Sequence, residues 1–194
     1  ACKPFVAALW GALSGSRVSS LSGRRREAPP GHHACRRFAP AARWLRTLIR
    51  PPNPHETLLP LEQIVATKRG DIDPRRACVQ CDESPWGAGA VLFINAKIAE
   101  YFVVTWTDDL ADKFETKIGN ADGQTTWEYM AIYLVLLTWA SSFRDEGLAI
   151  AGDNVAALAG VINLRGRSIL TQITREIAWR KCRYAWRFSS GHLP

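Results

Sequence analysis

The chain lacks any apolar run long enough to cross a bilayer, since a spanning helix needs about 20 consecutive apolar residues. The most apolar stretch, residues 130–139, is too short. Cysteine is also sparse: the five cysteines form no repeated pattern, which is typical of a reducing compartment. We therefore expect an intracellular protein without a membrane span.

Acidic residues are almost absent from both ends of the chain, which carries a formal net charge of +7. Glu27 is the single acid of residues 1–50, and Glu176 is the single acid of residues 165–187. This asymmetry favours a polyanionic partner over an inert basic surface. The predicted partner is nucleic acid, as DNA, messenger RNA or a structured RNA such as ribosomal RNA, and a large multi-subunit assembly is a further alternative.

The length and composition set the scale of the fold. With 194 residues, 47% of them hydrophobic, the chain is able to bury one core and a small appendage. It begins at Ala1 and ends at Pro194 within a motif, so we expect a processed or incomplete chain.

The N-terminal part divides into two segments. Residues 1–37 are rich in Arg and Ser, and they predict a helix over 3–13 and a flexible basic linker over 15–31. An amphipathic helix is predicted over 38–49, followed by prolines and a short helix over 58–67. The composition of the first segment is also that of a transit peptide, which leaves organellar import as an alternative.

Two groups of residues have metal-like spacing. Cys78 and Cys81 are three residues apart in a predicted strand, where their side chains point to opposite faces, so we interpret them as buried small hydrophobes. His32, His33 and Cys35 form a weak cluster to which we assign no site.

The most informative stretch is residues 78–93, Cys-Val-Gln-Cys-Asp-Glu-Ser-Pro-Trp-Gly-Ala-Gly-Ala-Val-Leu-Phe. It predicts a β-hairpin in which an apolar strand ends on Asp82 and a turn with two glycines leads into a second strand. By itself, Asp82 would equally be a solvated acid at a strand end. A third strand is predicted over 97–106, and Thr107 is predicted to cap a short acidic helix.

Two later acids, Glu128 and Asp153, also lie at the start or the end of a predicted apolar element, as Asp82 does. Glu128 lies in the first turn of an apolar helix predicted over 125–143, where an unpaired carboxylate would be costly. Asp153 ends a buried strand that begins at Gly147 and leads into a helix over 155–162. A helix over 168–182 and an alternating edge strand over 184–188 complete the predicted elements.

The order of these elements resembles the ribonuclease H domain that follows the polymerase in retroelement reverse transcriptases. The similar segments are Asp-Glu-Ser-Pro-Trp-Gly-Ala-Gly-Ala-Val-Leu, Thr-Thr-Trp-Glu-Tyr-Met-Ala-Ile, Asp-Asn-Val-Ala-Ala-Leu and Gly-His-Leu-Pro. The segment Pro-Phe-Val-Ala-Ala-Leu-Trp near the N-terminus is similar to the segment that leads into such domains. We favour this interpretation of the N-terminal residues over a transit peptide.

The resemblance implies an α/β fold: a mixed sheet of three antiparallel strands and then parallel strands, with helices on both faces. It also divides the chain into a basic segment over 1–37, a helical remnant of the polymerase connection over 38–75, and a ribonuclease H-like domain over 76–194. After His-Leu-Pro the family continues into a last helix with a fourth carboxylate, and this chain ends at Pro194.

The resemblance further assigns a site. Asp82, Glu128 and Asp153 would hold two Mg²⁺ or Mn²⁺ ions: Asp82 bridges both, Glu128 serves the leaving-group ion and Asp153 the nucleophile-side ion. His192 would take part in proton handling or product release. Contacts to nucleic acid are expected from Ser84, Gly87, Gln124, Thr125 and Asn154. The interleaved bases and aromatics before the C-terminus add Arg180, Lys181, Arg183 and Arg187.

Two functions of different class follow. The first is metal-dependent endonucleolytic hydrolysis of RNA in RNA/DNA hybrids. The second is a catalytically inactive ribonuclease H-like protein that serves as a structural or RNA-binding subunit of a larger assembly. The three acids favour the first function, and the basic ends with the eight tryptophans favour the second.

Overall fold

The computed structural model describes Phe5 and residues 35–49, 72–143, 146–167, 169–184 and 186–192. The chain divides into two compact units, Ala1–Leu58 and Leu59–Pro194. The domain boundaries predicted at 37–38 and 75–76 stay predictions. The helices predicted over 3–13 and 58–67, the linker over 15–31 and the histidines of the weak cluster lie outside the described residues.

The first unit contains helix α2, Cys35–Ile49, with Pro40 inside it. The helix predicted over 38–49 is therefore confirmed, although it begins earlier, at Cys35. The ring of Trp44 on this helix packs against that of Phe5, with centroids 5.9 Å apart.

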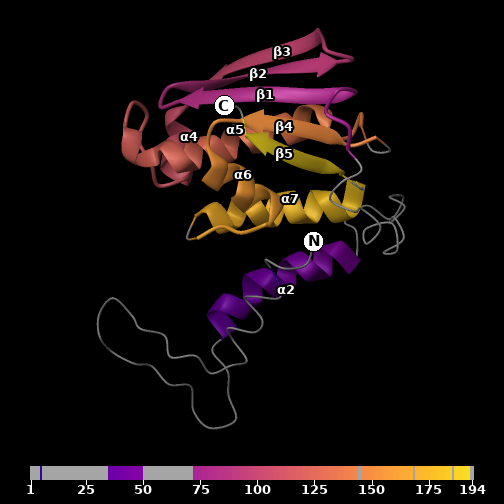
Figure 1. Cartoon of the computed structure of the whole chain (residues 1–194). Coiled ribbons are helices and arrows are strands. Elements are labelled where there is room, and N and C mark those ends of the chain that lie inside the picture. Colours follow the sequence, from indigo (N-terminus) through magenta and orange to yellow (C-terminus); the bar gives the residue numbers. More distant parts are fainter. Residues whose placement is uncertain are drawn as a thin grey trace. The chain divides into compact units, whose positions relative to one another are not determined.

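The second unit is built on a five-stranded sheet with the spatial order β3-β2-β1-β4-β5 (Figure 1). Strands β1 (Ala77–Ser84), β2 (Gly87–Ile94) and β3 (Lys97–Thr105) are successive antiparallel neighbours. Strand β4 (Leu148–Gly152) pairs in parallel with β1, and β5 (Phe188–His192) pairs in parallel with β4. This mixed sheet confirms the predicted ribonuclease H-like fold.

The strands follow from their side-chain patterns. Side chains of β1 alternate between buried and more exposed positions, as expected of a strand with one face on the core. All of β4 is buried, which fits a central strand with parallel neighbours. Asn95 and Ala96 join β2 to β3 with φ of 51° and 62°, and positive φ at both positions is the geometry of a type I′ turn.

The cysteines of β1 lie as the alternation predicted. Cys81 is buried, and its thiol donates a weak hydrogen bond to the Ala151 carbonyl at 3.7 Å. Cys78 is half-buried on the other face, and both thiols are free. Burial raises the pKa of Cys81 to about 12, and nearby carboxylates act in the same direction.

The helices begin close to where the sequence predicted them. Helix α4 spans Asp108–Lys113, and the Thr107 hydroxyl accepts a hydrogen bond from Leu110 N at 3.4 Å, which confirms the predicted cap. A short 3₁₀ turn, Ala121–Gly123, leads into α5, Gln124–Trp139. Helix α6 spans Val155–Ile162, as predicted.

The end of the described chain differs from the prediction. Helix α7 spans Leu170–Tyr184, and the strand predicted over 184–188 is wrong because β5 begins at Phe188. The Tyr184 ring packs against Trp179 and Trp186 instead of joining a strand ladder. The ladder begins where Leu148 N donates to the Arg187 carbonyl at 3.0 Å.

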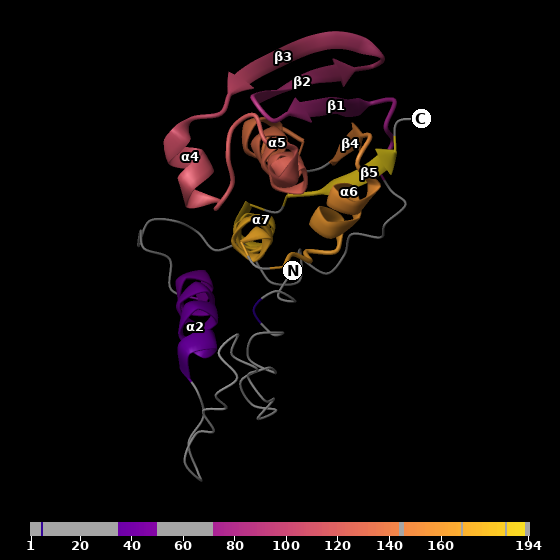
Figure 2. The same cartoon turned by 90° about the vertical axis from the view of Figure 1, so that its left-hand side faces the viewer.

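One face of the sheet carries the core. Helices α5 and α6 pack against the sheet, and α7 packs against α5 on the same side (Figure 2). Helices were predicted on both faces, and these three helices of the described residues lie on one. The largest fully buried side chains of this core are Val79, Leu92, Trp127, Ile132, Val135, Leu136, Leu148, Ile150, Val161, Thr174 and Ile177. Among the described residues, no helix combines the length and apolar character needed to cross a membrane.

Candidate metal centre

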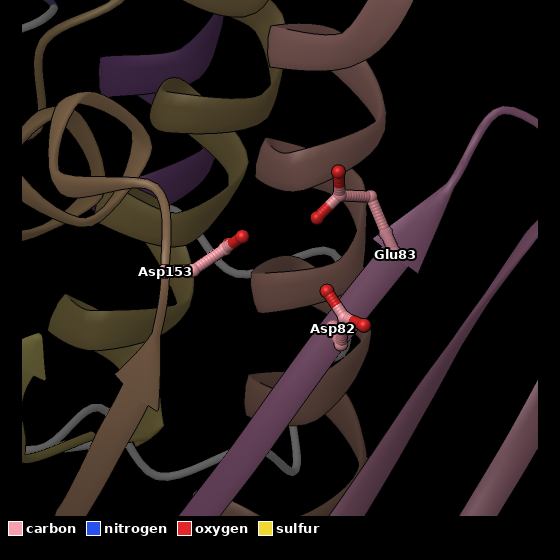
Figure 3. A group of neighbouring side chains, drawn as sticks. All are labelled: Asp82, Glu83 and Asp153. Atoms are coloured by element: carbon pink, nitrogen blue, oxygen red, sulfur yellow. The ribbon is translucent and has the colours of Figure 1, made fainter. Parts of the chain in front are cut away.

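Three carboxylates converge where β1 and β4 end. Each of Asp82, Glu83 and Asp153 offers an oxygen, and these ligand atoms all lie within 4.8 Å of one another. Figure 3 shows the Asp153 carboxylate directed toward β1 and the Glu83 carboxylate turned toward Asp153. Two of the three acids, Asp82 and Asp153, were predicted from the sequence, and Glu83 was not.

The sheet itself brings these side chains together. β1 and β4 are parallel neighbours with Gln80 opposite Ala151, so their carboxyl ends lie at the same edge of the sheet. Asp82 and Glu83 precede the end of β1, and Asp153 directly follows β4. Asp82 and Asp153 are exposed, which leaves this edge accessible from solvent.

Glu83 lies on the buried side of β1. It occupies the face of Val79 and Cys81 and is 9% exposed. The side-chain amide of Gln124 donates a hydrogen bond to its Oε1, and its carboxyl group is hydrogen-bonded to that of Glu128. Burial raises the pKa of Glu83 to about 9, and the contact with Glu128 together with the surrounding negative charges acts in the same direction.

Glu128 lies beside this cluster, on the second turn of α5. It is 7% exposed, and its carboxyl group is hydrogen-bonded to the side chains of Glu83 and Asn154. Burial raises its pKa, and these two hydrogen bonds oppose that effect. The amide oxygen of Asn154 also caps α6 by accepting from Ala157 N at 2.9 Å. The role of Glu128 as a metal ligand stays a prediction.

A shallow hollow lies in front of the acids on the outer face of β1, β2 and β3. Its volume is about 820 Å³, and both Asp82 and Asp153 contribute to its lining. Tyr101 and Val103, each 75% exposed, line it from β3, and Trp86 lines it from the β1–β2 turn. An open surface with exposed aromatic side chains is suited to contact with the flat rings of a ligand.

Five of the residues predicted to touch nucleic acid lie near the ends of β1, α5 and α6. Ser84 closes the β1–β2 turn, where its hydroxyl accepts from Trp86 N and donates to the Gly87 carbonyl, both at 3.3 Å. Thr125 is exposed on the first turn of α5. The side chains of Gln124 and Asn154 are engaged with Glu83 and Glu128, as described above. These contacts to nucleic acid stay predictions.

The predicted basic residues lie at the other end of the sheet. Phe188 pairs with Leu148 at the start of β4, so Arg187, which directly precedes β5, lies about one strand length, roughly 16 Å, from Asp153. Lys181 lies over the Phe188 ring at 4.3 Å and Arg180 over Trp186 at 5.8 Å.

Arg183 is buried, only 6% exposed, and lies over the Trp179 ring at 5.3 Å. Arg180 also forms an ion pair with Glu176 at 2.7 Å. These cations are therefore part of the aromatic packing around α7, and phosphate contacts by Arg180, Lys181, Arg183 and Arg187 stay a prediction.

His192 was predicted in a loop, and it lies at the end of β5 instead. Its backbone pairs with Gly152, the residue before Asp153. Parallel pairing with β4 therefore brings His192 to the same edge of the sheet as the acids. Its part in proton handling stays a prediction.

Glu83 was overlooked because it follows the more conspicuous Asp82. One signal was present: in an alternating strand, residues 79, 81 and 83 share a face, so an acid at 83 falls on the apolar side. A buried acid in such a place needs a partner. The period-two alternation of the strand was therefore sufficient to identify Glu83 as a candidate residue of the site.

The donor set fits a hard divalent cation. All three converging ligands are carboxylates, and oxygen-only ligands select ions such as Mg²⁺ and Mn²⁺. A bound cation would offset the negative charge of these neighbouring acids.

No family model matches the sequence, and no curated protein matches it. Among solved structures the chain is similar to RNase H1 from the halophilic archaeon Halobacterium salinarum NRC-1, with 16% identity, coverage of 61% of this chain and 86% of that chain, and a TM-score of 0.43.

Two foamy virus structures are also similar. One is the foamy viral protease-reverse transcriptase dRH in complex with double-stranded DNA, with 9% identity, 98% and 30% coverage of the two chains, and a TM-score of 0.41. The other is the native Prototype Foamy Virus protease-reverse transcriptase, with 8% identity, 98% and 21% coverage, and a TM-score of 0.43.

Proposed function

We propose that this chain is a retroelement-derived ribonuclease H-like domain that hydrolyses RNA in RNA/DNA hybrids with Mg²⁺ or Mn²⁺. The observation that carries the proposal is the convergence of carboxylate oxygens within 4.8 Å at the end of β1 and β4. It is supported by the ribonuclease H-like strand order, which places acids from distant segments at one edge of a sheet.

The cation would be held by Asp82 and Asp153, with Glu128 as the further ligand that the resemblance predicts. Two such ions would activate a water and stabilise the leaving 3′ oxygen of a phosphodiester. Asp82 and Asp153 are exposed, so a phosphate group is able to approach them from solvent. Asn154 orients the Glu128 carboxyl group while its own position is fixed by the start of α6.

Selection of RNA would come from contacts to 2′-hydroxyl groups across an A-form minor groove. Thr125 is the exposed hydroxyl on the first turn of α5, next to the segment that carries Glu128. The hollow over β2 and β3, with Tyr101 at its wall, would support the hybrid beyond the cleavage point.

The test is cleavage of an end-labelled RNA strand in an RNA/DNA hybrid, with Mg²⁺ or Mn²⁺, by the full chain. We expect cleavage by the wild type and by the control Asp109→Asn, an exposed acid on α4. Asp82→Asn should reduce cleavage to background, and EDTA should abolish it for every variant. Single-stranded RNA and double-stranded DNA should remain intact.

A folded wild-type chain that leaves the hybrid uncut in both metals would overturn the proposal. A mobility-shift experiment with the same hybrid and with a structured RNA then decides what replaces it. Tight binding without cleavage would support the catalytically inactive RNA-binding subunit.

A further inference from the structure

Strand β3 forms one edge of the five-stranded sheet. Among the described strands it pairs only with β2, and Figure 1 and Figure 2 show no other described helix or strand beside its free side. The strand has nine residues, whereas native edge strands are commonly kept short. Its free side is therefore a long row of main-chain groups that the described sheet does not use.

The register of β3 shows which main-chain groups these are. Just beyond the strand, Trp106 N donates to the Trp86 carbonyl at 2.9 Å, so the groups of Trp106 face β2. Residues of an antiparallel strand alternate in this respect, and the carbonyl oxygens of Phe102 and Val104 likewise point toward β2. The N–H and C=O groups that point away from β2 are those of Tyr101, Val103 and Thr105.

The second half of this edge is unprotected. Native edges are usually guarded by lysine, proline, a bulge or an inward-pointing charge. In β3 the register shift and Lys97 both lie at the start of the strand. Glu100 points inward, where its carboxylate accepts from Trp139 Nε1 at 2.7 Å. Residues 101–105 carry none of these guards.

The same residues present exposed apolar side chains. Tyr101 and Val103 are each 75% exposed on the outer face of the sheet. The ring of Phe102, between them, packs against Trp139 on the helix side, with centroids 5.3 Å apart. Aromatic and β-branched residues favour strands and form stabilising cross-strand pairs. This half of β3 is therefore suited to pairing with a further strand.

Strand β3 is complementary to a copy of itself. When two β3 strands pair in the antiparallel direction about Phe102, Tyr101 of each lies opposite Val103 of the other. This register forms two aromatic–β-branched pairs and brings the free main-chain groups of both residues together. A centre at Tyr101 would instead oppose Val103 to Ala99, which lies at the register shift.

The charges at the two ends of β3 agree with this direction. Lys97 is exposed at the start of the strand. After the end of the strand the chain stays extended at Thr107, and the exposed acids Asp108 and Asp109 follow. Antiparallel pairing brings the basic start of each strand near the acidic end of the other.

We propose that two copies of this chain associate through antiparallel pairing of their β3 strands, which joins the two sheets into one continuous sheet. Directly opposed residues of a sheet point to the same face, so the outer faces of both copies lie on one side of the joined sheet. The hollow beside Asp82 and Asp153 therefore stays open in each copy. This inference does not depend on the proposed nuclease activity.

The test is sedimentation equilibrium of the full chain, after nuclease treatment so that no nucleic acid bridges two copies. The wild type should approach twice the chain mass at high micromolar concentration. Val103→Lys brings two like charges close across the paired strands, and we expect the dissociation constant to rise by about tenfold or more. Trp86→Lys is the matched control, since Trp86 is 62% exposed and lines the same hollow away from the edge.

The direction of pairing has its own test. Lys97→Glu places like charges at both ends of the seam and should raise the dissociation constant by about threefold. Adding Asp108→Lys to the same chain should restore the wild-type value. A double variant that associates no better than Lys97→Glu would reject the antiparallel arrangement.

Tyr101→Lys serves as a second edge variant and should weaken association as Val103→Lys does, while circular dichroism confirms that both are folded. A wild type that stays monomeric at high micromolar concentration would overturn the proposal. Association lost in Trp86→Lys but kept in Val103→Lys would indicate stacking of outer faces instead. Equal association in all variants would place the contact elsewhere in the chain, and either result overturns pairing through β3.

Discussion

The indole rings of Trp106 and Trp127 lie almost parallel, with centroids 4.8 Å apart and an interplanar angle of 11°. Trp106 follows β3, and its Nε1 donates a hydrogen bond to the Ser84 carbonyl at 2.9 Å. Trp127 immediately precedes Glu128 on α5. The stacked pair therefore connects the end of β1 to the helix turn that carries the buried acid.

Replacement of Trp106 should loosen this connection. Trp106 is 6% exposed, so Trp106→Ala leaves a cavity and an unpaired Ser84 carbonyl, and we expect a loss of about 3–5 kcal/mol in the free energy of unfolding. Urea denaturation followed by circular dichroism measures it. Trp86→Ala is the control, because Trp86 is 62% exposed and should change stability by less than about 0.5 kcal/mol. Equal losses of unfolding free energy in the two variants would show that the stacked pair makes no special contribution to stability.

The two glycines of β2 should respond differently to alanine. A Cβ at Gly87 would lie 2.2 Å from the Val104 carbonyl oxygen, which belongs to the backbone of β3 and is unable to move aside. A Cβ at Gly89 would lie 3.7 Å from its nearest atom, the Phe102 carbonyl oxygen, an ordinary contact. We expect Gly87→Ala to cost about 3 kcal/mol or more.

Gly89→Ala should instead be nearly neutral in the same urea experiment, since the added methyl group makes only an ordinary van der Waals contact. A similar loss in both variants would contradict the steric explanation and indicate that the hairpin tolerates no side chain on this face.

The turn between β2 and β3 offers a stabilising change. Ala96 has a φ of 62°, a left-handed conformation that costs a residue with a Cβ roughly 1–2 kcal/mol. Ala96→Gly removes that strain but increases the entropy of the unfolded chain, so we expect a net gain of about 0.5–1 kcal/mol. Asn95→Gly should gain less, because Asn tolerates this region. A lower urea midpoint for Ala96→Gly would be inconsistent with this strain.

The metal-free protein should lose stability as the pH rises. Glu83 has an ordinary pKa of 4.5 when unfolded and of about 9 in the fold, so between these values the folded state binds more protons than the unfolded state. Stability therefore declines from about pH 5 toward pH 9. Urea midpoints in EDTA at pH 5.5 and pH 8.5 measure the decline. Glu83→Gln should reduce it clearly, and an identical decline in that variant would assign the effect to other groups.

Much of this fold was predictable because the local signals and the tertiary structure agree. The hairpin of β1 and β2 follows from alternation and a glycine turn, and α6 begins and ends at the predicted residues, Val155 and Ile162. Thr107 caps α4 because its hydroxyl is suited to the exposed amides of a first turn. The same agreement placed Asp82 and Asp153 together, since Asp82 lies near the end of β1 and Asp153 directly follows β4.

The errors arise where neighbours distant in the chain decide the structure. The segment Phe-Ser-Ser-Gly-His has little intrinsic strand preference, and it becomes β5 because β4 presents a free edge for pairing. Tyr184 and Trp186 alternate like strand residues, but their rings pack against each other and around the end of α7. Glu83 was missed for a related reason: alternation in β1 signals that it is buried, but its partner Gln124 lies 41 residues further along the chain.

The parallel pairing of β1 with β4 has a consequence for how the site forms. Cys81 and Ala151 are in contact although 70 residues separate them, whereas β1, β2 and β3 are joined by short turns. Closing so large a loop costs more chain entropy than closing a hairpin. The antiparallel strands β1, β2 and β3 are therefore able to assemble early, and β4 joins them late. A molecule arrested before that step would hold Asp82 and Glu83 without Asp153. Competence to bind metal would then mark the completion of folding.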